Sequence, residues 1–429
     1  MAEIRPFKGF LYNKSKINGD FSDVVAPPYD VISPEMQDEL HKKNEYNVIR
    51  LILGKDQNND NNTNNKYTRA RFCLEEWIKK EVLVKDNEES FYIYAQKYNY
   101  NGEEYRRLGF IGLMKIGETY GDEILPHEFT LAKPKEDRMN LIKEVKSNLS
   151  PIFCIFDDEN GKVKKILDKN MNKKNLAVSA EADGELNELW RITDKKDVEA
   201  IVSIMKEKKV FIADGHHRYE VAKNYRDLLK KQPGYKGAAD HIMMYFADMI
   251  DSSNLTIMAT HRAIKNLPYK NSEEIIAKLK EHFKIAECAD LAEVMKELSK
   301  IKKDSVGFGI FTGEKYYMIE PNSMSVITGL IEEKRSAEWK KLDVSILHFA
   351  ILTKILKIGN IEGNITYVKN PEQGVSLVKD GSHKVAFFLN PTKVEQLRSV
   401  AELGEMMPQK STYFYPKLLT GLVMNRFEL

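Results

Sequence analysis

The sequence predicts a mixed α/β (α+β) protein, and two observations lead to this. Short apolar runs typical of buried strands alternate with amphipathic helix patterns along the 429 residues, which favours sheets covered by helices. The length exceeds what one hydrophobic core usually serves, so we expect more than one subdomain. The predicted segments are an N-terminal α/β lobe over 1–120, a core over 121–265 and a C-terminal α/β lobe over 266–429.

Composition excludes several classes of protein. Hydrophobic residues make up 42% and charged residues 30%, which is ordinary globular composition. Lys+Arg 66 against Asp+Glu 64 leaves a net charge of only +2, so nucleic acid is an unlikely partner. Three cysteines without C-x-x-C spacing predict neither a disulfide framework nor a zinc knuckle.

Hydropathy predicts the solubility and cellular location of the protein. No run approaches the roughly 20 apolar residues that a membrane helix needs. The N-terminus, M-A-E-I-R-P-F-K-G-F, lacks the apolar region of a secretory signal. We therefore expect a soluble, cytoplasmic protein without a membrane partner.

The first segment begins with a rigid loop. Pro27 and Pro28 force an extended course, and Ser33-Pro34 is typical of a helix start. The asparagine-rich tract 56–66 is too polar to pack and predicts a mobile surface loop before a helix over 67–80. Strand-like runs over 90–100 and 106–115 surround Asn101-Gly102 and predict an antiparallel hairpin.

The later segments alternate helices and strands. We expect a helix from about 136 to 147, a buried strand over 148–156 and a helix over 196–206. The run V-F-I-A-D-G then predicts a strand that turns into a helix toward Lys230. From about 266, amphipathic helices mix with short strands. No Walker A loop, no strand-linked G-x-G-x-x-G and no H-E-x-x-H occurs in the sequence, which argues against a P-loop enzyme, a Rossmann cofactor site and a zinc protease.

The stretch D-G-H-H-R, Asp214–Arg218, is the strongest candidate for a site. Gly215 permits a sharp turn, and the helix that follows offers backbone N–H groups to an anion. Arg218 can grip phosphate, Asp214 can orient a histidine or a metal, and either His216 or His217 can exchange protons. Alternatively, Asp214 caps the helix and the basic side chains are solvated.

Two further clusters, at 127–138 and 260–262, combine histidine, hydroxyl and cationic residues at predicted turns, and Lys410-Ser411-Thr412 adds a lysine with two hydroxyl groups. If these clusters converge on one polyanionic ligand, Glu128 or Asp137 is a candidate catalytic base. The candidate phosphate contacts are His127, Thr130, Arg138, His261, Arg262, Lys410 and Ser411. Taken singly, the clusters around His127 and His261 are more typical of solvated surface side chains, and 409–412 is equally compatible with a helix cap.

Five motifs resemble one family in order along the chain. They are A-P-P-Y-D-V-I-S, H-E-F-T with K-E-D-R, I-A-D-G-H-H-R-Y-E-V-A, T-H-R-A-I and M-P-Q-K-S-T-Y-F-Y-P-K-L. Together they resemble the family of unknown function DUF1015, whose members are often labelled SpoOJ/ParA/ParB/RepB-like. The D-G-H-H-R turn is also similar to the signature of the ParB/sulfiredoxin-like fold, to which an archaeal free serine kinase belongs.

This resemblance implies a nucleotide-binding core with flanking α/β lobes, in which Asp214–Arg218 line a phosphate site. It also implies a phosphotransferase or phosphatase of serine biosynthesis, acting on serine or phosphoserine. The expected cofactors are a nucleotide (ATP, ADP or AMP) and Mg²⁺, and the metal ligands are unknown. Sulfiredoxin chemistry would need a cysteine where this chain has Gly215-His216.

Two other functions stay open. A ParB-like, nucleotide-switched DNA-associated protein would bind DNA in a salt-sensitive way. A non-catalytic nucleotide or metabolite sensor would bind its ligand without turnover.

Overall fold

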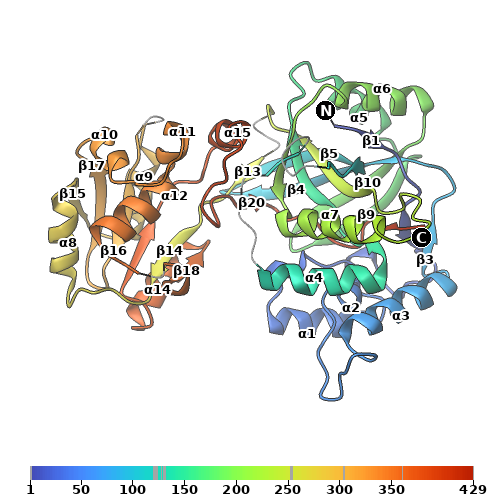
Figure 1. Ribbon diagram of the computed structural model, residues 1–429, viewed down its shortest axis with the longest axis horizontal. Coiled ribbons are helices and arrows are strands. Elements are labelled where there is room, and N and C mark those ends of the chain that lie inside the picture. Colours follow the sequence, from blue (N-terminus) through green and yellow to red (C-terminus); the bar gives the residue numbers. More distant parts are fainter. Residues whose placement is uncertain are drawn as a thin grey trace. The chain divides into compact units, whose positions relative to one another are not determined.

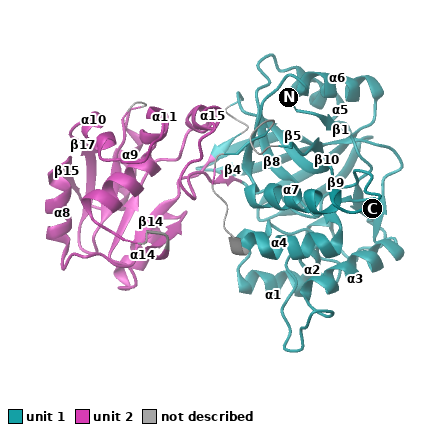
Figure 2. Ribbon diagram, viewed as in Figure 1, with its two compact units in different colours: residues 1–126, 130–256, 416–429 teal, residues 127–129, 257–415 magenta. Residues whose placement is uncertain are grey.

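The computed structural model describes residues 2–118, 124–126, 128, 132–251, 255–302, 305–359 and 361–428, without the side chains of 132–133 and 361–362. The chain forms two compact units (Figure 2). Unit 1 comprises residues 1–126, 130–256 and 416–429, and unit 2 comprises 127–129 and 257–415. Both units combine sheets and helices (Figure 1), which confirms the mixed α/β class. The division into three segments stays a prediction.

Unit 1 is built on one large sheet. Its strands follow the order β6-β11-β8-β12-β5-β4-β10-β9, and β1 pairs with β5. Strand β8 runs antiparallel to β11 and parallel to β12. The strands are β1 Ile4–Arg5, β4 Phe91–Tyr100, β5 Glu103–Lys115, β6 Ile124–Leu125, β8 Ile152–Phe156, β9 Leu176–Ala182, β10 Glu185–Ile192, β11 Val210–Asp214 and β12 His241–Asp248.

The predicted hairpin is confirmed by β4 and β5, which pair antiparallel around Asn101 and Gly102. Both turn residues have positive φ, 52° and 83°. A two-residue turn with positive φ at both positions matches the right-handed twist of the strands it joins.

One face of this sheet is apolar and covered by helices. Alternate strand residues such as Phe110 and Phe246 form a buried cluster with side chains from three helices. These helices are α5 Lys162–Asn170, α6 Lys195–Met205 and α7 His216–Lys230. The burial of every second residue follows from the two-residue repeat of a strand.

A second buried cluster of unit 1 joins further helices around Trp77. The helices are α1 Pro34–Lys43, α2 Ile49–Ile52, α3 Lys66–Lys79 and α4 Ala132–Val145, and short 3₁₀ turns cover Phe21–Asp23 and Tyr29–Val31. The expected start of α1 is confirmed, because the Ser33 hydroxyl accepts from the Met36 N–H at 3.2 Å with Pro34 in the first turn.

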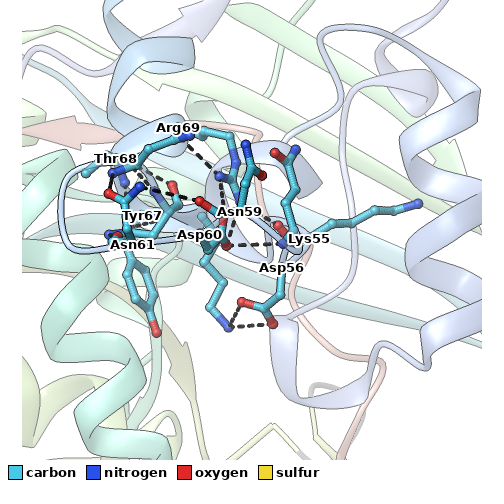
Figure 3. A network of polar contacts seen from close by, with 12 residues as sticks. Lys55, Asp56, Asn59, Asp60, Asn61, Tyr67, Thr68 and Arg69 are labelled. Carbon is cyan, nitrogen blue, oxygen red and sulfur yellow. Dashed lines mark hydrogen bonds and ion pairs between the residues drawn. The ribbon is translucent and has the colours of Figure 1, made fainter.

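The asparagine-rich tract forms a loop tied by its own side chains (Figure 3). Asn61 Oδ1 accepts from the backbone N–H groups of Thr63 and Asn64, both at 2.9 Å. Arg69 donates to the Asp60 carboxylate from both terminal nitrogens, Nη1 to Oδ1 at 2.5 Å and Nη2 to Oδ2 at 3.0 Å. We expected a tract that cannot pack; in the structure, hydrogen bonds and an ion pair to α3 take the place of apolar packing.

Unit 2 holds a six-stranded antiparallel sheet of order β15-β17-β16-β19-β14-β18. Its strands are β14 His261–Ile264, β15 Phe283–Cys288, β16 Phe308–Phe311, β17 Tyr316–Pro321, β18 Ile365–Val368 and β19 Val385–Phe388. Its helices are α8 Ser272–Lys280, α9 Leu291–Ser299, α10 Met324–Gly329, α11 Ala337–Lys340, α12 Asp343–Ser345, the π-helical segment Ile346–Ile355, α13 Ile361–Asn364, α14 Pro371–Lys379 and α15 Val394–Glu402.

Three short two-stranded ribbons complete the structure. They are β2 Phe10–Tyr12 with β3 Leu83–Lys85, β7 Ser147–Asn148 with β21 Asn425–Arg426, and β13 Thr256–Ile257 with β20 Phe414–Tyr415. In the part of the chain that the structure describes, no helix is both long and apolar enough to cross a membrane.

Candidate functional site

The D-G-H-H-R stretch forms the predicted strand-to-helix turn in unit 1. Strand β11 ends at Asp214, and helix α7 begins at His216. Gly215 between them has φ +100°, a left-handed conformation that favours glycine. A Cβ at this position would also lie only 2.8 Å from Nη2 of Arg218. Glycine therefore allows both the turn and the return of the Arg218 side chain over it.

Asp214 is the electrostatic centre of this turn. Arg218 Nη2 lies 3.2 Å from one carboxylate oxygen, and Lys417 Nζ contacts the other. Burial opposes ionisation of the Asp214 carboxyl, but Lys417 and Arg218 together hold its pKa well below the usual range. The carboxylate is therefore ionised throughout the neutral range.

A buried polar network positions Lys417. Gln96 of β4 donates to the Lys417 carbonyl at 3.0 Å, and the Arg107 guanidinium of β5 donates to the carbonyl of Pro416. The Tyr94 hydroxyl accepts from the N–H two residues beyond Lys417 at 3.2 Å. Residues 416–419 are thus fixed against the sheet, which brings the Lys417 side chain to Asp214.

A pocket lies beside Arg218, with about 590 Å³ of empty space including open solvent. Apolar side chains of α4 and α7 line it together with Tyr29, Arg138 and Ser150. Arg218 Nη1 donates to the Ser150 hydroxyl at 2.8 Å and to the Pro151 carbonyl at 2.7 Å. One arginine therefore contacts both the Asp214 turn and the pocket.

The pocket also brings in the predicted residue Arg138, whose side chain is 8% exposed. Its guanidinium lies 4.0 Å from the Tyr29 ring centre, a cation–π distance. Arg138 donates to Asp137 at 2.8 Å and to the Ile52 carbonyl at 2.7 Å. Burial raises the pKa of the Tyr29 hydroxyl, so this group stays protonated and can donate a hydrogen bond.

The two adjacent histidines differ in exposure. His216 is buried at 5%, whereas His217 is partly exposed. This difference follows from the 100° step between neighbouring positions on a helix. Which of the two exchanges protons stays a prediction.

The other described candidates lie in unit 2. Arg262 is fully buried, and it donates to the carbonyls of Thr260 and Lys410, the latter at 3.0 Å, and to His348 Nε2 at 3.3 Å. Burial lowers the pKa of Arg262 to about 10. In this structure its guanidinium binds two backbone carbonyls and the His348 ring, and the contact with phosphate stays a prediction.

His261, Ser411 and Glu128 have partners in the same unit. His261 Nδ1 accepts from the Leu389 N–H at 3.3 Å, and burial lowers the pKa of His261 to about 4. The Ser411 hydroxyl donates to the Pro408 carbonyl at 2.5 Å. Glu128 Oε1 accepts from the Lys410 N–H at 3.4 Å. The predicted residues His127 and Thr130 lie outside the described residues.

Comparison with known proteins now gives the family. The sequence profile described as "Protein of unknown function (DUF1015)" matches residues 4–345. The chain belongs to the DUF1015 family. None of the curated proteins compared with this DUF1015 chain matches it.

Three solved structures resemble the DUF1015 chain weakly. A conserved hypothetical protein from Pyrococcus furiosus shares 15% identity over 71% of this chain and 91% of its own, with a TM-score of 0.34. A free serine kinase in complex with AMP shares 14% identity over 70% of this chain and 86% of its own, with a TM-score of 0.33. SbnI with a C-terminal truncation, from Staphylococcus aureus, shares 11% identity over 72% of this chain and 85% of its own, with a TM-score of 0.34. Likeness at this level carries no argument about activity.

Two residues of the site were absent from the sequence-based candidates. Tyr29 lies in A-P-P-Y-D and Lys417 in Y-F-Y-P-K, so the DUF1015 motifs contained the signal. Spacing alone could not find them, because a single tyrosine or lysine has no periodic pattern. Lys417 also lies beyond the matched range 4–345.

Proposed function

We propose that this protein moves a phosphoryl group to or from the side-chain oxygen of serine, as a phosphotransferase or phosphatase that binds nucleotide phosphates at the D-G-H-H-R turn. The observation that carries the proposal is the ionised Asp214 between Arg218 and Lys417 at the start of α7. Such a turn combines helix N–H groups with two cations, which together suit a phosphate group.

Arg218 has donors left for a ligand. A guanidinium carries five N–H groups, and toward the described residues Arg218 uses three, which bind Ser150, Pro151 and Asp214. The remaining two lie on Nε and Nη2, the atoms closest to the turn glycine. We infer that they bind a phosphoryl oxygen next to the N-terminus of α7.

Asp214 and the histidines divide the remaining work. A carboxylate whose pKa is held low by two cations is a weak general base, but it suits a Mg²⁺ ion that arrives with the phosphates. Among the described residues, no three His, Cys, Asp or Glu side chains gather at one point, so the phosphates would supply most of the Mg²⁺ ligands. His216 or His217 would donate the proton to the departing serine oxygen.

The choice of serine rests on the resemblance of the five motifs to DUF1015. In the phosphatase reaction, a water oxygen attacks phosphorus, the bond to the serine oxygen breaks, and that oxygen takes a proton. In transfer, a terminal oxygen of AMP or ADP takes the place of water. The pocket beside Arg218 offers space for the amino acid, with Arg138 and Tyr29 on its wall.

Phosphorus NMR of the purified protein tests the proposal. Phosphoserine and Mg²⁺ are supplied without nucleotide and, separately, with AMP, ADP or ATP. Loss of the phosphoserine signal is expected, and the product peak distinguishes hydrolysis from transfer. An unchanged spectrum in every sample, despite nucleotide binding, would favour a sensor instead.

A matched pair of variants ties the activity to the turn. Arg218→Ala should lower the rate at least a hundredfold, because a group that stabilises transferred charge commonly contributes about that factor. Arg398→Ala removes an arginine from another i,i+4 ion pair, with Glu402 in unit 2, and should have no effect. Melting temperatures show whether each variant is folded. Full activity in folded Arg218→Ala protein would contradict the proposed site.

A further inference from the structure

A second pocket of unit 1 is lined by positive charge. It contains about 1140 Å³ of empty space, open solvent included, and shares no lining residue with the pocket beside Arg218. Its cationic lining residues are Arg5, Lys8, Lys85, Lys236 and Arg426, and His241 lies among them. We name this set the basic pocket.

The charge of the basic pocket is not matched by acids. Its lining has five Lys and Arg against two Glu, Glu89 and Glu428, a surplus of three charges. The whole chain has a net charge of only +2, so the remainder of the protein is close to neutral. Like charges at one concavity repel each other, and a bound anion would relieve that repulsion.

Among the described residues, four of these cations form no ion pair with an acidic side chain, although Glu428 attracts Lys8 and Arg5 from a longer distance. Lys85 pairs with Glu428. No acidic side chain in the described part of the chain lies within 4.0 Å of the charged groups of Arg5, Lys8, Lys236 or Arg426, all of which are exposed. Their charges are therefore available to a ligand.

His241 adds an unsatisfied polar atom to the wall. Its Nδ1 is buried and has no hydrogen-bond partner among the described residues. A buried polar atom without a partner is unfavourable, and a ligand that reached it would relieve this cost. Burial, and then the positive charge of Arg5, lower the pKa of His241 to about 4, so the ring is neutral at neutral pH.

The elements that supply these groups are far apart in sequence. Arg5 belongs to β1, Lys85 to β3, His241 to β12 and Arg426 to β21, while Lys236 lies in the loop before β12. A single phosphate would satisfy two or three cations, whereas a chain of linked phosphates presents several charges at once. We propose that the basic pocket binds a small polyanion with two or more linked phosphate groups, such as tripolyphosphate or the phosphate chain of a nucleotide.

Calorimetry with the full chain and inorganic tripolyphosphate at low salt tests this inference. One site is expected in the Arg218→Ala protein, in which the turn can no longer contribute. The double variant Arg5→Gln with Arg426→Gln removes two of the five cations, so it should weaken binding by about tenfold or more. A tenfold loss corresponds to about 1.4 kcal/mol. Because Arg5 and Arg426 are exposed, the double variant should have the same melting temperature as the unsubstituted protein.

The control removes the same charge elsewhere in unit 1. Lys195 and Lys196 are exposed at the start of α6, and Lys195→Gln with Lys196→Gln should preserve the affinity. Equal weakening in both double variants, or no binding by the Arg218→Ala protein, would overturn the proposal. So would a gel shift of short duplex DNA that depends on Arg5 and Arg426 without any binding of tripolyphosphate.

Discussion

Lys417 and Asp214, 203 positions apart in the sequence, form an ion pair at the end of strand β11. The side chains of Lys417 and Asp214 are 11% and 21% exposed, so the pair is largely shielded from water. Since Gln96 donates to the Lys417 carbonyl and Arg107 to the carbonyl of the preceding Pro416, this relationship connects the buried face of the main sheet to the D-G-H-H-R turn.

Lys417→Met should destabilise the fold and weaken phosphate binding. The change leaves Asp214 with Arg218 alone, and breaking a buried pair from one side commonly costs about 3–5 kcal/mol. We expect about half of this loss in urea unfolding, because Arg218 remains. Phosphoserine or nucleotide affinity should fall about tenfold, since one of two cations is gone.

The double variant Lys417→Met with Asp214→Asn provides the control. Removing both charges eliminates the uncompensated carboxylate, so stability should recover by more than half. The direction of the pH dependence of this ion pair also follows from the pKa of Asp214. Since the pKa of Asp214 is lowered on folding, the pair stabilises the protein above the unfolded pKa, and this stabilisation is lost as pH falls through the folded one. Additive losses in the double variant would contradict a direct interaction.

Gly215→Ala should strain the backbone at the turn and also displace the Arg218 side chain. Alanine at φ +100° is strained, and its Cβ would displace Arg218 from its position 2.8 Å away. Gly184→Ala is the matched control, because Gly184 also has positive φ, +77°, but nothing lies within 4 Å of its Cβ position. Each should lose about 1–2 kcal/mol of stability from backbone strain.

Only Gly215→Ala should also lower ligand affinity, because only there does the new methyl group move a phosphate-binding side chain. The measurement is nucleotide binding by calorimetry beside urea unfolding of both variants. Equal affinity in the two variants would show that the placement of Arg218 over Gly215 has no role in binding.

Local patterns predicted much of this architecture. The Asn101-Gly102 hairpin, the Ser33-Pro34 helix start and the strand-turn-helix around Gly215 depend on neighbouring residues, and all three are present. The pairing of Lys417 with Asp214 could not be predicted, because it depends on contacts between β4, β5 and a segment more than 300 residues later in the chain.

The site candidates show the same limit. Arg138 and Arg218 line one pocket, while convergence of the clusters on one ligand stays a prediction. The same reasoning about charge at a turn predicts Arg262 as a phosphate contact; in the structure its guanidinium is fully buried and binds carbonyl groups. Sequence shows that a cation is present, whereas burial decides which acceptors reach it.

Asn61→Ala should loosen the asparagine-rich loop. Asn61 Oδ1 accepts three hydrogen bonds, each at 2.9 Å, from the Thr63 N–H, the Thr63 hydroxyl and the Asn64 N–H. Their loss should raise the hydrogen-exchange rate of residues 56–66 about fivefold, equivalent to roughly 1 kcal/mol. Asn62→Ala, an exposed neighbour, should leave exchange unchanged. Equal exchange in both variants would show that the loop does not depend on these bonds.

Asp343 should make the stability of unit 2 depend on pH. Burial raises the pKa of this carboxyl to about 7, whereas an unfolded aspartate has a pKa of about 3.9. The folded state therefore binds the proton more tightly. The resulting stabilisation is complete below the unfolded pKa and is lost as pH rises through about 7.

Asp343→Asn mimics the protonated carboxyl. Compared with the natural chain, it should be nearly neutral at about pH 4 and more stable by about 1–3 kcal/mol at about pH 8, less than the full linkage value because the side chain is only partly buried. His261 and His348, whose pKa values burial lowers to about 4 and about 3, are present in both proteins and cancel in the difference.

Asp380→Asn is the control with the opposite sign. Hydrogen bonds from Ser382 lower the pKa of the exposed Asp380 carboxyl, so its loss should slightly reduce stability at neutral pH. Urea unfolding followed by Trp339 fluorescence, with the other two tryptophans replaced by phenylalanine, reports on unit 2. If the difference between Asp343→Asn and the natural chain stays constant from about pH 4 to about pH 8, Asp343 ionises in the folded protein as it does in the unfolded chain, and burial does not control its titration.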